Sequence, residues 1–315
     1  MIYELKYCGA NTGRWSGGGG LNLQNLNRSE AEGVDLRRGI IASPGHVLAA
    51  VDFAQIESRV LLWLAGDHET LAMLAANPNV DVYEAHARAT MGWKPECGVR
   101  NSECGVEESL KSYCARTGST LRQLAKARVL GLGFGCGAEK FVAVARAMAG
   151  LDLSLEQAEK VVRAYRKSNP KVVGLWRRLE DAARSKVGKD YVLPLPCTQA
   201  VRGYGRFLIY RGLRLVDREL VCRVGGKDLK IYGGLLAENW TQATARDVLA
   251  EAWLRCVDAG YVPVLSVHDE LVFELPETSA EADLARIVTL MEEPIAWARG
   301  LPLKAEGAMM RFYQK

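Results

Sequence analysis

The sequence predicts an α+β fold, in which an antiparallel sheet is combined with a mainly helical region. Three observations indicate this fold class. Apolar runs at 46–52, 262–267 and 271–275 have the length of buried strands, and apolar residues recur at helical spacing over most of 67–185. Between 191 and 232, Val, Leu, Ile and Tyr alternate with Arg and Gly, which is typical of short strands in hairpins.

The first 66 residues combine a loop, a strand and a helix. The stretch NTGRWSGGGGLNLQN at 11–25 predicts a loop whose glycines let the backbone approach another group closely. The run VLAAV then predicts a short buried strand that ends in Asp52. Ile56, Val60 and Leu64 recur at helical spacing, and Gly66 predicts the end of that helix.

The remaining elements follow from the same patterns. Residues 93–118 contain Pro95, Gly98 and Gly105 and predict a loop-rich insertion among the helices. A helix is predicted over 235–257, followed by two strands with His268, Asp269 and Glu270 at the hairpin tip. A helix over 280–299 and a final strand complete the expected order.

Composition narrows the class of protein only slightly. A net charge of +4 on 315 residues does not by itself identify a nucleic-acid-binding protein. The basic stretch from Arg202 to Lys230 is either a surface that attracts phosphate or an ordinary solvated β-rich surface. No signal peptide and no apolar run of about 20 residues is present. Eight scattered cysteines are typical of a reducing cytoplasm, so we expect a cytoplasmic protein without a membrane partner.

Two acidic residues stand at strand ends. Asp269 and Glu270 at a hairpin tip suit a hard cation, because Mg²⁺ prefers carboxylate oxygens, phosphates and waters. The alternative is a solvated turn, since Asp is common in turns. Asp52 ends another strand, and two carboxylates brought together repel unless a cation lies between them. A two-metal centre for phosphoryl transfer would resolve this repulsion.

A third element supplies positive charge. Arg122 and Lys126 are four residues apart on a predicted helix and share a face, which Leu130 and Phe134 continue. Such a face could bind a triphosphate and then a base, although an amphipathic surface helix would show the same pattern. The glycines at positions 131, 133, 135 and 137 favour close approach to a ligand, because each costs a helix about 1 kcal/mol.

These motifs together resemble DNA polymerases of family A, of the bacterial repair and bacteriophage type. Three segments carry the resemblance. The first metal motif of the family is matched by VDFAQIESRVLLWLAGD, and the second metal motif is matched by SVHDELVFE. The motif of the fingers helix is matched by RQLAKARVLGLGFG. TGRWSGGGGLNLQNL resembles the segment that grips the primer-template, and ENWTQATARDVL the helix that follows the minor groove. The closing LPLKAEG also matches, so the resemblance covers nearly the whole chain.

The resemblance implies a metal site and a reaction. Asp52 and Asp269 would bind two Mg²⁺ ions, with Mn²⁺ as a substitute. The backbone carbonyl of Phe53 would be a further ligand, and Glu270 would lie nearby. The reaction would be template-directed transfer of dNMP to a primer 3′-hydroxyl with release of pyrophosphate, and Lys126 could protonate that product.

The resemblance also implies the residues that contact nucleotide and DNA. Glu57 would exclude a 2′-hydroxyl and so select deoxynucleotides, with Gln55 and Arg59 in support. Arg122 and Lys126 would bind the dNTP triphosphate. The remaining expected nucleotide-binding residues are Leu130 and Tyr83, and the expected DNA-binding residues are Arg14, Asn25, Arg59, Phe134, Gln242 and His268.

The chain departs from the family pattern at several positions. Leu130 replaces the aromatic ring that usually packs on the nucleotide sugar, a stacking contact worth about 1–3 kcal/mol. Tyr83 stands where many relatives have a histidine, and Glu238 where they have an asparagine. The segment 93–118 lengthens the usual spacing between the first two motifs.

The resemblance implies a right-hand polymerase fold that lacks a thumb. We expect palm at 1–66, fingers at 67–227 with the insertion at about 93–118, and palm again at 228–315. Neither a thumb nor an exonuclease precedes Arg14, so a separate chain or a missing upstream region would supply them. A bacteriophage origin, with action on primer-template DNA in the host cytoplasm, fits the resemblance of 230–249 to phage members.

Two alternatives remain. A single-subunit RNA polymerase shares the fold and both aspartates, but Glu57 argues against it, because a ribonucleotide enzyme needs room for the 2′-hydroxyl. The chain could also be a DNA-binding polymerase subunit that depends on a partner. The presence of the expected catalytic and triphosphate-binding residues argues against a loss of polymerase activity, but not against dependence on a partner. These residues are Asp52, Asp269, Arg122 and Lys126.

Overall fold

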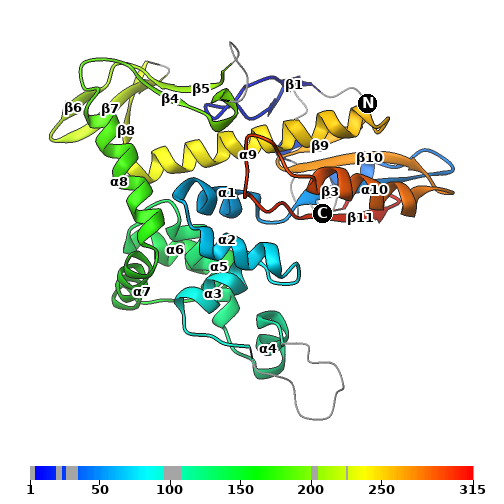
Figure 1. The fold of residues 1–315 in the computed structure, drawn as a ribbon, viewed down its shortest axis with the longest axis horizontal. Helices are drawn as coiled ribbons and strands as arrows, with labels where there is room; N and C mark the ends of the chain where they lie inside the picture. Colours follow the sequence, from blue (N-terminus) through cyan, green and yellow to red (C-terminus); the bar gives the residue numbers. More distant parts are fainter. Residues whose placement is uncertain are drawn as a thin grey trace. The chain divides into compact units, whose positions relative to one another are not determined.

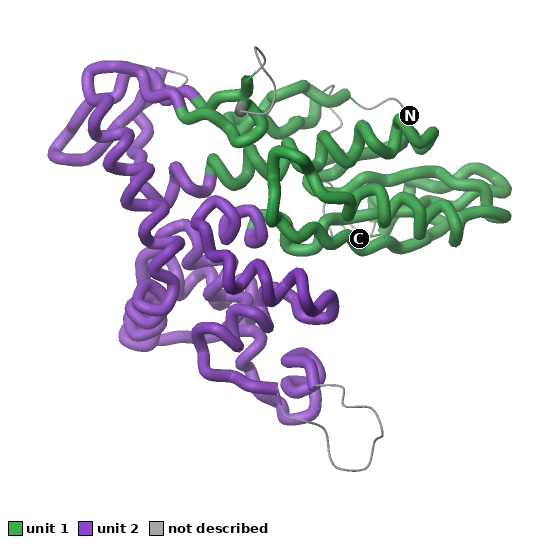
Figure 2. The backbone as a smooth tube through the Cα atoms, in the orientation of Figure 1, with its two compact units in different colours: residues 1–57, 193–208, 239–315 green, residues 58–192, 209–238 purple. Residues whose placement is uncertain are grey.

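A computed structural model describes residues 4–18, 23–25, 35–95, 108–199, 205–224 and 226–314 of the chain, except the side chains of Asn25 and Gln199. These residues form two compact units (Figures 1 and 2). Unit 1 consists of residues 1–57, 193–208 and 239–315, and unit 2 consists of residues 58–192 and 209–238. The expected domain limits at 66 and 228 therefore stay a prediction, since these units divide at other positions.

Unit 1 is built on an antiparallel sheet with the strand order β11-β3-β10-β9 (Figure 1). Its strands are β3 (His46–Phe53), β9 (Leu265–Val267), β10 (Glu270–Pro276) and β11 (Ala305–Met310). The strand predicted at 46–52 and the hairpin predicted from 262 to 275 are both confirmed. The hairpin brings β10 beside β3, 217 residues away in sequence, because both strands are largely apolar and need a common core.

Different elements pack against the two faces of this sheet. Leu48 and Ala50 point to the same face, two residues apart, and pack in a core with Val272 and Tyr313. On β11, Gly307 lies so close to α10 (Ala280–Glu292) that an added Cβ would be 2.6 Å from Leu284. Helix α10 therefore covers the opposite face. Asp52 continues the alternation of Leu48 and Ala50, so it lies on the face without α10.

Short elements complete unit 1. They are β1 (Leu5–Lys6) paired with β2 (Ser16–Gly17), and the 3-10 helices η1 (Leu23–Asn25), η2 (Leu36–Gly39) and η3 (Pro196–Gln199). The 26-residue helix α9 (Gly233–Asp258) starts in the last residues of unit 2 and continues in unit 1. The helix predicted over 280–299 ends at Glu292, because Pro294 imposes extended backbone on Glu293.

Unit 2 is mainly helical, as predicted (Figure 1). Its helices are α1 (Ile56–Ala65, without its first two residues), α2 (His68–Ala76), α3 (Val82–Thr90), α4 (Leu110–Thr117), α5 (Leu121–Leu132), α6 (Ala138–Ala149), α7 (Leu155–Ser168) and α8 (Pro170–Arg184). Gly66, at the end of α1, has φ +73°, which confirms the predicted stop. No helix in the described part of the chain is long and apolar enough to cross a membrane.

The insertion predicted to be loop-rich contains helix α4, which corrects that prediction. Ser109 caps the helix by accepting a 3.1 Å hydrogen bond from Ser112 N, and Gly118 ends it with φ +70°. Leu110 and Cys114, one turn apart, are buried and anchor the helix to its neighbours. Residues 96–107 lie outside the described part of the chain.

The predicted hairpins are confirmed as a two-stranded and a three-stranded sheet. These are β4 (Tyr191–Pro194) with β5 (Phe207–Tyr210), and β6 (Arg214–Val216), β7 (Glu219–Val224) and β8 (Lys227–Ile231). Many basic residues of the 202–230 stretch are paired with acids: Arg206 with Asp247, Arg211 with Asp190, Arg214 with Asp228, and Lys230 with Glu219. This pairing favours the solvated-surface interpretation over a phosphate-binding surface.

Candidate active site

Carboxylates from three strands meet at one edge of the unit 1 sheet. Asp52 on β3 lies directly opposite Glu270 on β10 and, on its other side, opposite Glu306 on β11. Directly paired residues of antiparallel strands point to the same face, so the three side chains form a row. Like charges placed opposite one another are destabilising, and a bound cation would relieve the repulsion.

Asp269 joins this edge through the β9–β10 turn. Its carbonyl oxygen accepts a 3.3 Å hydrogen bond from the Phe53 N–H, which anchors the turn beside the end of β3. His268 in the same turn has φ +55°, a left-handed conformation uncommon for a residue other than glycine. The Gln24 side chain holds this turn, because its Oε1 accepts from His268 N at 3.0 Å while its Nε2 donates to Ser266 O.

Glu270 is buried and has a defined partner. The Tyr313 hydroxyl donates a 2.8 Å hydrogen bond to its Oε1. Burial, followed by the charge and hydrogen bond of Glu270, raises the pKa of Tyr313, so the hydroxyl keeps its proton and remains a donor. One oxygen of Glu270 is thus committed to Tyr313.

The donor set at this edge fits magnesium. Asp52 and Asp269 are carboxylates from two neighbouring strand ends, and Phe53, which follows Asp52 directly, donates its N–H to the Asp269 carbonyl. In the described part of the chain, no group of three or more His, Cys, Asp or Glu side chains is arranged to hold a metal ion. Mg²⁺ is usually held by one or two carboxylates, with waters and substrate phosphates as its other ligands, so a two-aspartate site suits it.

Arg14 contacts the predicted sugar-selecting residue. Its guanidinium forms an ion pair with Glu57, at the start of α1. Arg14, His268 and Asp269 also line one small cavity of about 20 Å³. Another lining residue, Arg246, is buried and stacks on Trp15 at 4.3 Å from the ring centroid. The predicted DNA-binding residue Gln242 is half-buried one turn earlier on α9.

Two other predicted site residues, Gln55 and Arg59 of the first metal motif, have buried polar groups. Gln55 forms the turn between β3 and α1 with φ +49°, and its Oε1 is buried without a hydrogen bond from any described residue. Arg59 is 4% exposed, which favours a supporting role over direct contact with DNA. Asn25 belongs to η1, but its side chain lies outside the described residues.

In unit 2, helix α5 carries the predicted cationic face. Arg122 lies in its first turn and Lys126 one turn later, exposed to solvent. The Arg122 Nη2 is 2.5 Å from Asp81 Oδ2, and its guanidinium lies 5.3 Å from the centre of the Tyr83 ring. Burial acts to lower the pKa of Arg122, but the hydrogen bond and charge of Asp81 outweigh it and raise that pKa overall. Leu130 is half-buried two turns after Arg122.

The predicted stripe on α5 ends before Phe134, because the helix ends at Leu132. Gly133 and Gly135 form the turn around Phe134, and an added Cβ on Gly133 would be 2.9 Å from Leu61 Cδ2. On α9, a Cβ on Gly234 would be 2.1 Å from Phe134 O. Gly133 thus permits close packing within the chain and Gly135 supplies a left-handed turn with φ +79°, so the interpretation that these glycines make room for a ligand stays a prediction.

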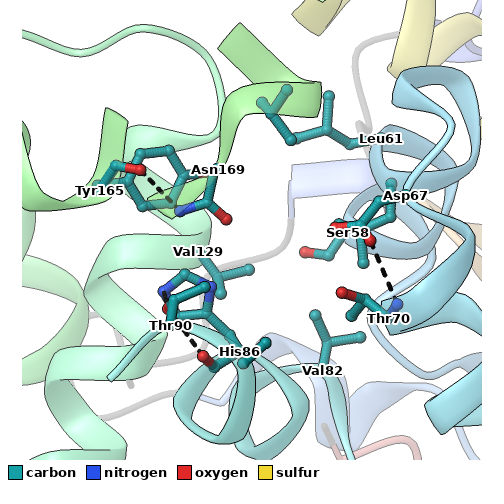
Figure 3. Close-up of a pocket in the computed structure, with 13 residues that line it drawn as sticks. Ser58, Leu61, Asp67, Thr70, Val82, His86, Thr90, Val129, Tyr165 and Asn169 are labelled. Atoms are coloured by element: carbon teal, nitrogen blue, oxygen red, sulfur yellow. Dashed lines mark hydrogen bonds between the residues drawn. The ribbon is translucent and has the colours of Figure 1, made fainter. Parts of the chain in front are cut away.

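An interior cavity of about 30 Å³ lies among the helices of unit 2 (Figure 3). His86, Thr90, Tyr165 and Asn169 point into it. Burial, with a smaller contribution from Arg128, lowers the pKa of His86 to about 3, so the ring is neutral near pH 7. The cavity has room for a water molecule rather than a nucleotide, so it is not the candidate active site.

Each unit brings some of the predicted site residues close to one another. Unit 1 brings together Asp52, Phe53, Asp269 and Glu270, and separately Arg14 with Glu57. Unit 2 brings Tyr83 against Arg122. Sequence reasoning missed four residues that contact this set: Gln24, Asp81, Glu306 and Tyr313. Gln24 and Glu306 lie inside motifs that resemble the family, and Asp81 lies two residues before Tyr83, but only long-range pairing shows what they contact.

Comparisons with known proteins show which family this chain is similar to. Residues 3–193 match the model of DNA polymerase family A. A DNA polymerase of Bacillus phage SP02 is 31% identical over 363 aligned positions, covering 99% of this chain and 52% of the phage protein. DNA polymerase I of Thermus thermophilus is 29% identical, covering 90% of this chain and 29% of that protein.

A solved structure shares the fold. It is the POL domain of Pol1 from M. smegmatis, in complex with DNA primer-template and dNTP, with a TM-score of 0.64 and 19% identity. It covers 99% of this chain and 48% of the other, and at this identity it supports the fold alone. The fold is therefore the mixed helical and antiparallel-sheet architecture of a polymerase palm and fingers.

The chain belongs to DNA polymerase family A. It spans about half the length of the phage SP02 polymerase and about 29% of the Thermus thermophilus enzyme.

Proposed function

We propose that this chain catalyses template-directed addition of deoxynucleotides to a primer 3′-hydroxyl. The observation that carries the proposal is the strand register that sets Asp52 opposite Glu270, with the Asp269 turn anchored to Phe53. This edge concentrates negative charge in a member of DNA polymerase family A. Two Mg²⁺ ions bound by Asp52 and Asp269 would lower the pKa of the 3′-hydroxyl and stabilise charge on the leaving oxygen.

The residues of unit 2 act on the incoming nucleotide. Arg122 and Lys126 bind the triphosphate, and Leu130 and Tyr83 lie along the same nucleotide. The primer 3′-oxygen forms a bond to the α-phosphorus while the bond from that phosphorus to the bridging oxygen breaks. Lys126 donates its proton to the departing pyrophosphate, because it is the exposed cation of the α5 face.

The residues of unit 1 select the sugar and hold the primer end. Glu57 occupies the position that excludes a 2′-hydroxyl, with Gln55 of the same unit and Arg59 of unit 2 in support. Arg14, Gln242 and His268 contact the DNA near the primer terminus, together with Asn25. Arg14 and His268 line one cavity with Asp269, which supports a common role for them. Phe134 of unit 2 stacks beside the template base.

A second candidate function follows from the length of the relatives. Because the chain spans 52% of the phage SP02 polymerase, another chain or region could supply the thumb and exonuclease. The chain would then be the catalytic part of a larger polymerase and depend on that partner to hold DNA. The phage relatives support a role in phage DNA replication, in the cytoplasm of a bacterial host.

Primer extension by the isolated chain tests the proposed function. With Mg²⁺ and dNTPs we expect extension, and Asp52→Asn or Asp269→Asn should lower kcat by about 10³-fold, since several kcal/mol of charge stabilisation is lost. Glu281→Gln, an exposed carboxylate on α10, is the matched control and should keep full activity. The proposal fails if both aspartate variants extend primers as fast as the control.

The same assay separates the remaining alternatives. A preference for NTPs over dNTPs would identify a single-subunit RNA polymerase instead. Binding of primer-template without extension, even at high Mg²⁺ or with Mn²⁺, would favour the partner-dependent subunit.

A further inference from the structure

Asp81 lies where two helix N-termini approach each other in unit 2. It precedes α3, and its Oδ1 accepts a 2.8 Å hydrogen bond from Glu84 N, so one carboxylate oxygen caps that helix. Its other oxygen, Oδ2, is 2.5 Å from the Arg122 Nη2 in the first turn of α5. One side chain therefore joins the start of α3 to the start of α5.

Arg122 is restrained on two sides. Asp81 holds one edge of the guanidinium, and the Tyr83 ring lies against its face at 5.3 Å. A cation in the first turn of a helix is disfavoured by the helix dipole, and the Asp81 carboxylate offsets this effect. Thr120, at the N-cap of α5, makes no side-chain cap, and the Asp81 carboxylate supplies negative charge at this helix end.

The restraint leaves hydrogen-bonding capacity on Arg122. Its Nη1 is buried and has no hydrogen-bond partner among the described residues. The Arg122 side chain as a whole is 25% exposed, so a guanidinium that Asp81 holds in place can still be reached by an anion from solvent. The exposed Lys126 lies one turn further along the same face of α5 and would contact the same anion.

We propose that Asp81 is a positioning residue that, with Tyr83 behind the guanidinium, orients Arg122 for the triphosphate of the incoming nucleotide. This inference rests on the proposed function and adds to it a residue that no sequence motif marked. Asp81 does not touch the substrate. It fixes Arg122 in place so that the exposed part of the side chain meets phosphate without first losing side-chain freedom.

The two roles of Asp81 can be separated by mutation. Asn caps helices about as well as Asp, so Asp81→Asn keeps the cap on α3 but removes the charge that holds Arg122. Asp81→Ala removes both functions. Tyr83→Phe keeps the ring beneath Arg122, whereas Tyr83→Ala removes it.

Steady-state primer extension on the full chain measures the effect. Asp81→Asn should raise the KM for dNTP about tenfold, the size expected for one charge-assisted contact, and change kcat by less than about twofold. The Ki for pyrophosphate as an inhibitor should rise in parallel, and the Kd for primer-template should not change. Tyr83→Ala should raise the KM for dNTP as Asp81→Asn does, and Tyr83→Phe, which keeps the ring beside Arg122, should raise it less.

The melting temperature of each variant distinguishes positioning from loss of the fold. A purely structural role predicts that Asp81→Asn lowers the melting temperature while the KM for dNTP stays unchanged, and an unchanged KM would overturn the proposal. A fall in KM would also overturn it, since it would mean that Asp81 competes with the substrate for Arg122. If the unmodified chain extends no primer, the proposed function fails, and calorimetric titration with Mg²⁺-dTTP then compares the same variants without catalysis.

Discussion

The two units arrange their charged residues in opposite ways. In unit 1, Asp52 lies between Glu270 and Glu306, so like charges face one another at a sheet edge. In unit 2, Arg122 is already paired with Asp81 before any substrate binds. A cluster of like charges needs a counter-ion from outside the chain, whereas a balanced pair only needs to be well oriented. The acidic edge is thus suited to hold a cation and the basic helix to receive a phosphate.

The largest of the effects that distinguish the two units concerns Lys126, the exposed cation of the Arg122–Lys126 pair on α5. Lys126→Ala should lower the single-turnover extension rate at saturating dNTP by about 10²-fold, the usual size of general acid catalysis. Lys140→Ala, exposed in the first turn of α6, is the control and should leave the rate unchanged. A loss confined to KM would assign Lys126 to binding alone and remove its predicted role as an acid.

The buried His86 tests whether the core of unit 2 tolerates an added charge. Its pKa is about 3 in the folded chain and 6.5 when unfolded, so the unfolded state binds more protons between these values. Stability is therefore full above pH 6.5 and falls as the pH decreases towards 3. From pH 7 to pH 5 this residue should cost about 2 kcal/mol, or roughly 30-fold in the unfolding equilibrium.

Denaturant titrations at pH 7 and pH 5 measure this loss. His86→Gln removes the titrating group, so the difference in unfolding free energy between the two pH values should become smaller by that amount. His68→Gln, at an exposed position on α2, should keep the full difference. Equal pH dependence in both variants would show that His86 is not the source.

The smallest expected effect links the primer end to sugar selection. Arg14 is paired with Glu57, so Arg14→Ala should free the Glu57 side chain and weaken exclusion of the 2′-hydroxyl. The ratio of kcat/KM for dATP over ATP should fall about tenfold, a loss of about 1.4 kcal/mol in discrimination. Arg38→Ala, exposed in η2, is the control. If DNA binding weakens while the ratio stays constant, Glu57 acts without Arg14.

The sequence predicted local structure better than contacts between distant segments. The strand at 46–52 and the helix that stops at Gly66 are as expected, because their signals are periodic and short-range. Helix α4 was missed, although Ser109 and Gly118 are recognisable caps, because the proline and glycines before it dominated the pattern. Phe134 was assigned to a helix stripe that ends two residues earlier, since Gly133 begins a turn.

The partners of the site residues could not be predicted from the same patterns. Glu306 lies opposite Asp52, and Tyr313 donates to Glu270, through the late strand β11 and the segment after it. Asp81 meets Arg122 across 41 residues. Periodicity tells which face a side chain occupies, but not which other segment packs against that face. The roles assigned to the site residues therefore came from family resemblance, whereas these partners came from the fold.

The glycine pair at the start of α9 has a consequence for how this sequence can vary. Any side chain on Gly233 or Gly234 would overlap the backbone carbonyls of Trp176 and Phe134, at 2.1 Å in each case. A backbone obstacle cannot be relieved by a new rotamer. Even alanine at either position would therefore require the backbone to move, so a change that adds neither charge nor polarity would still displace Trp176 or Phe134.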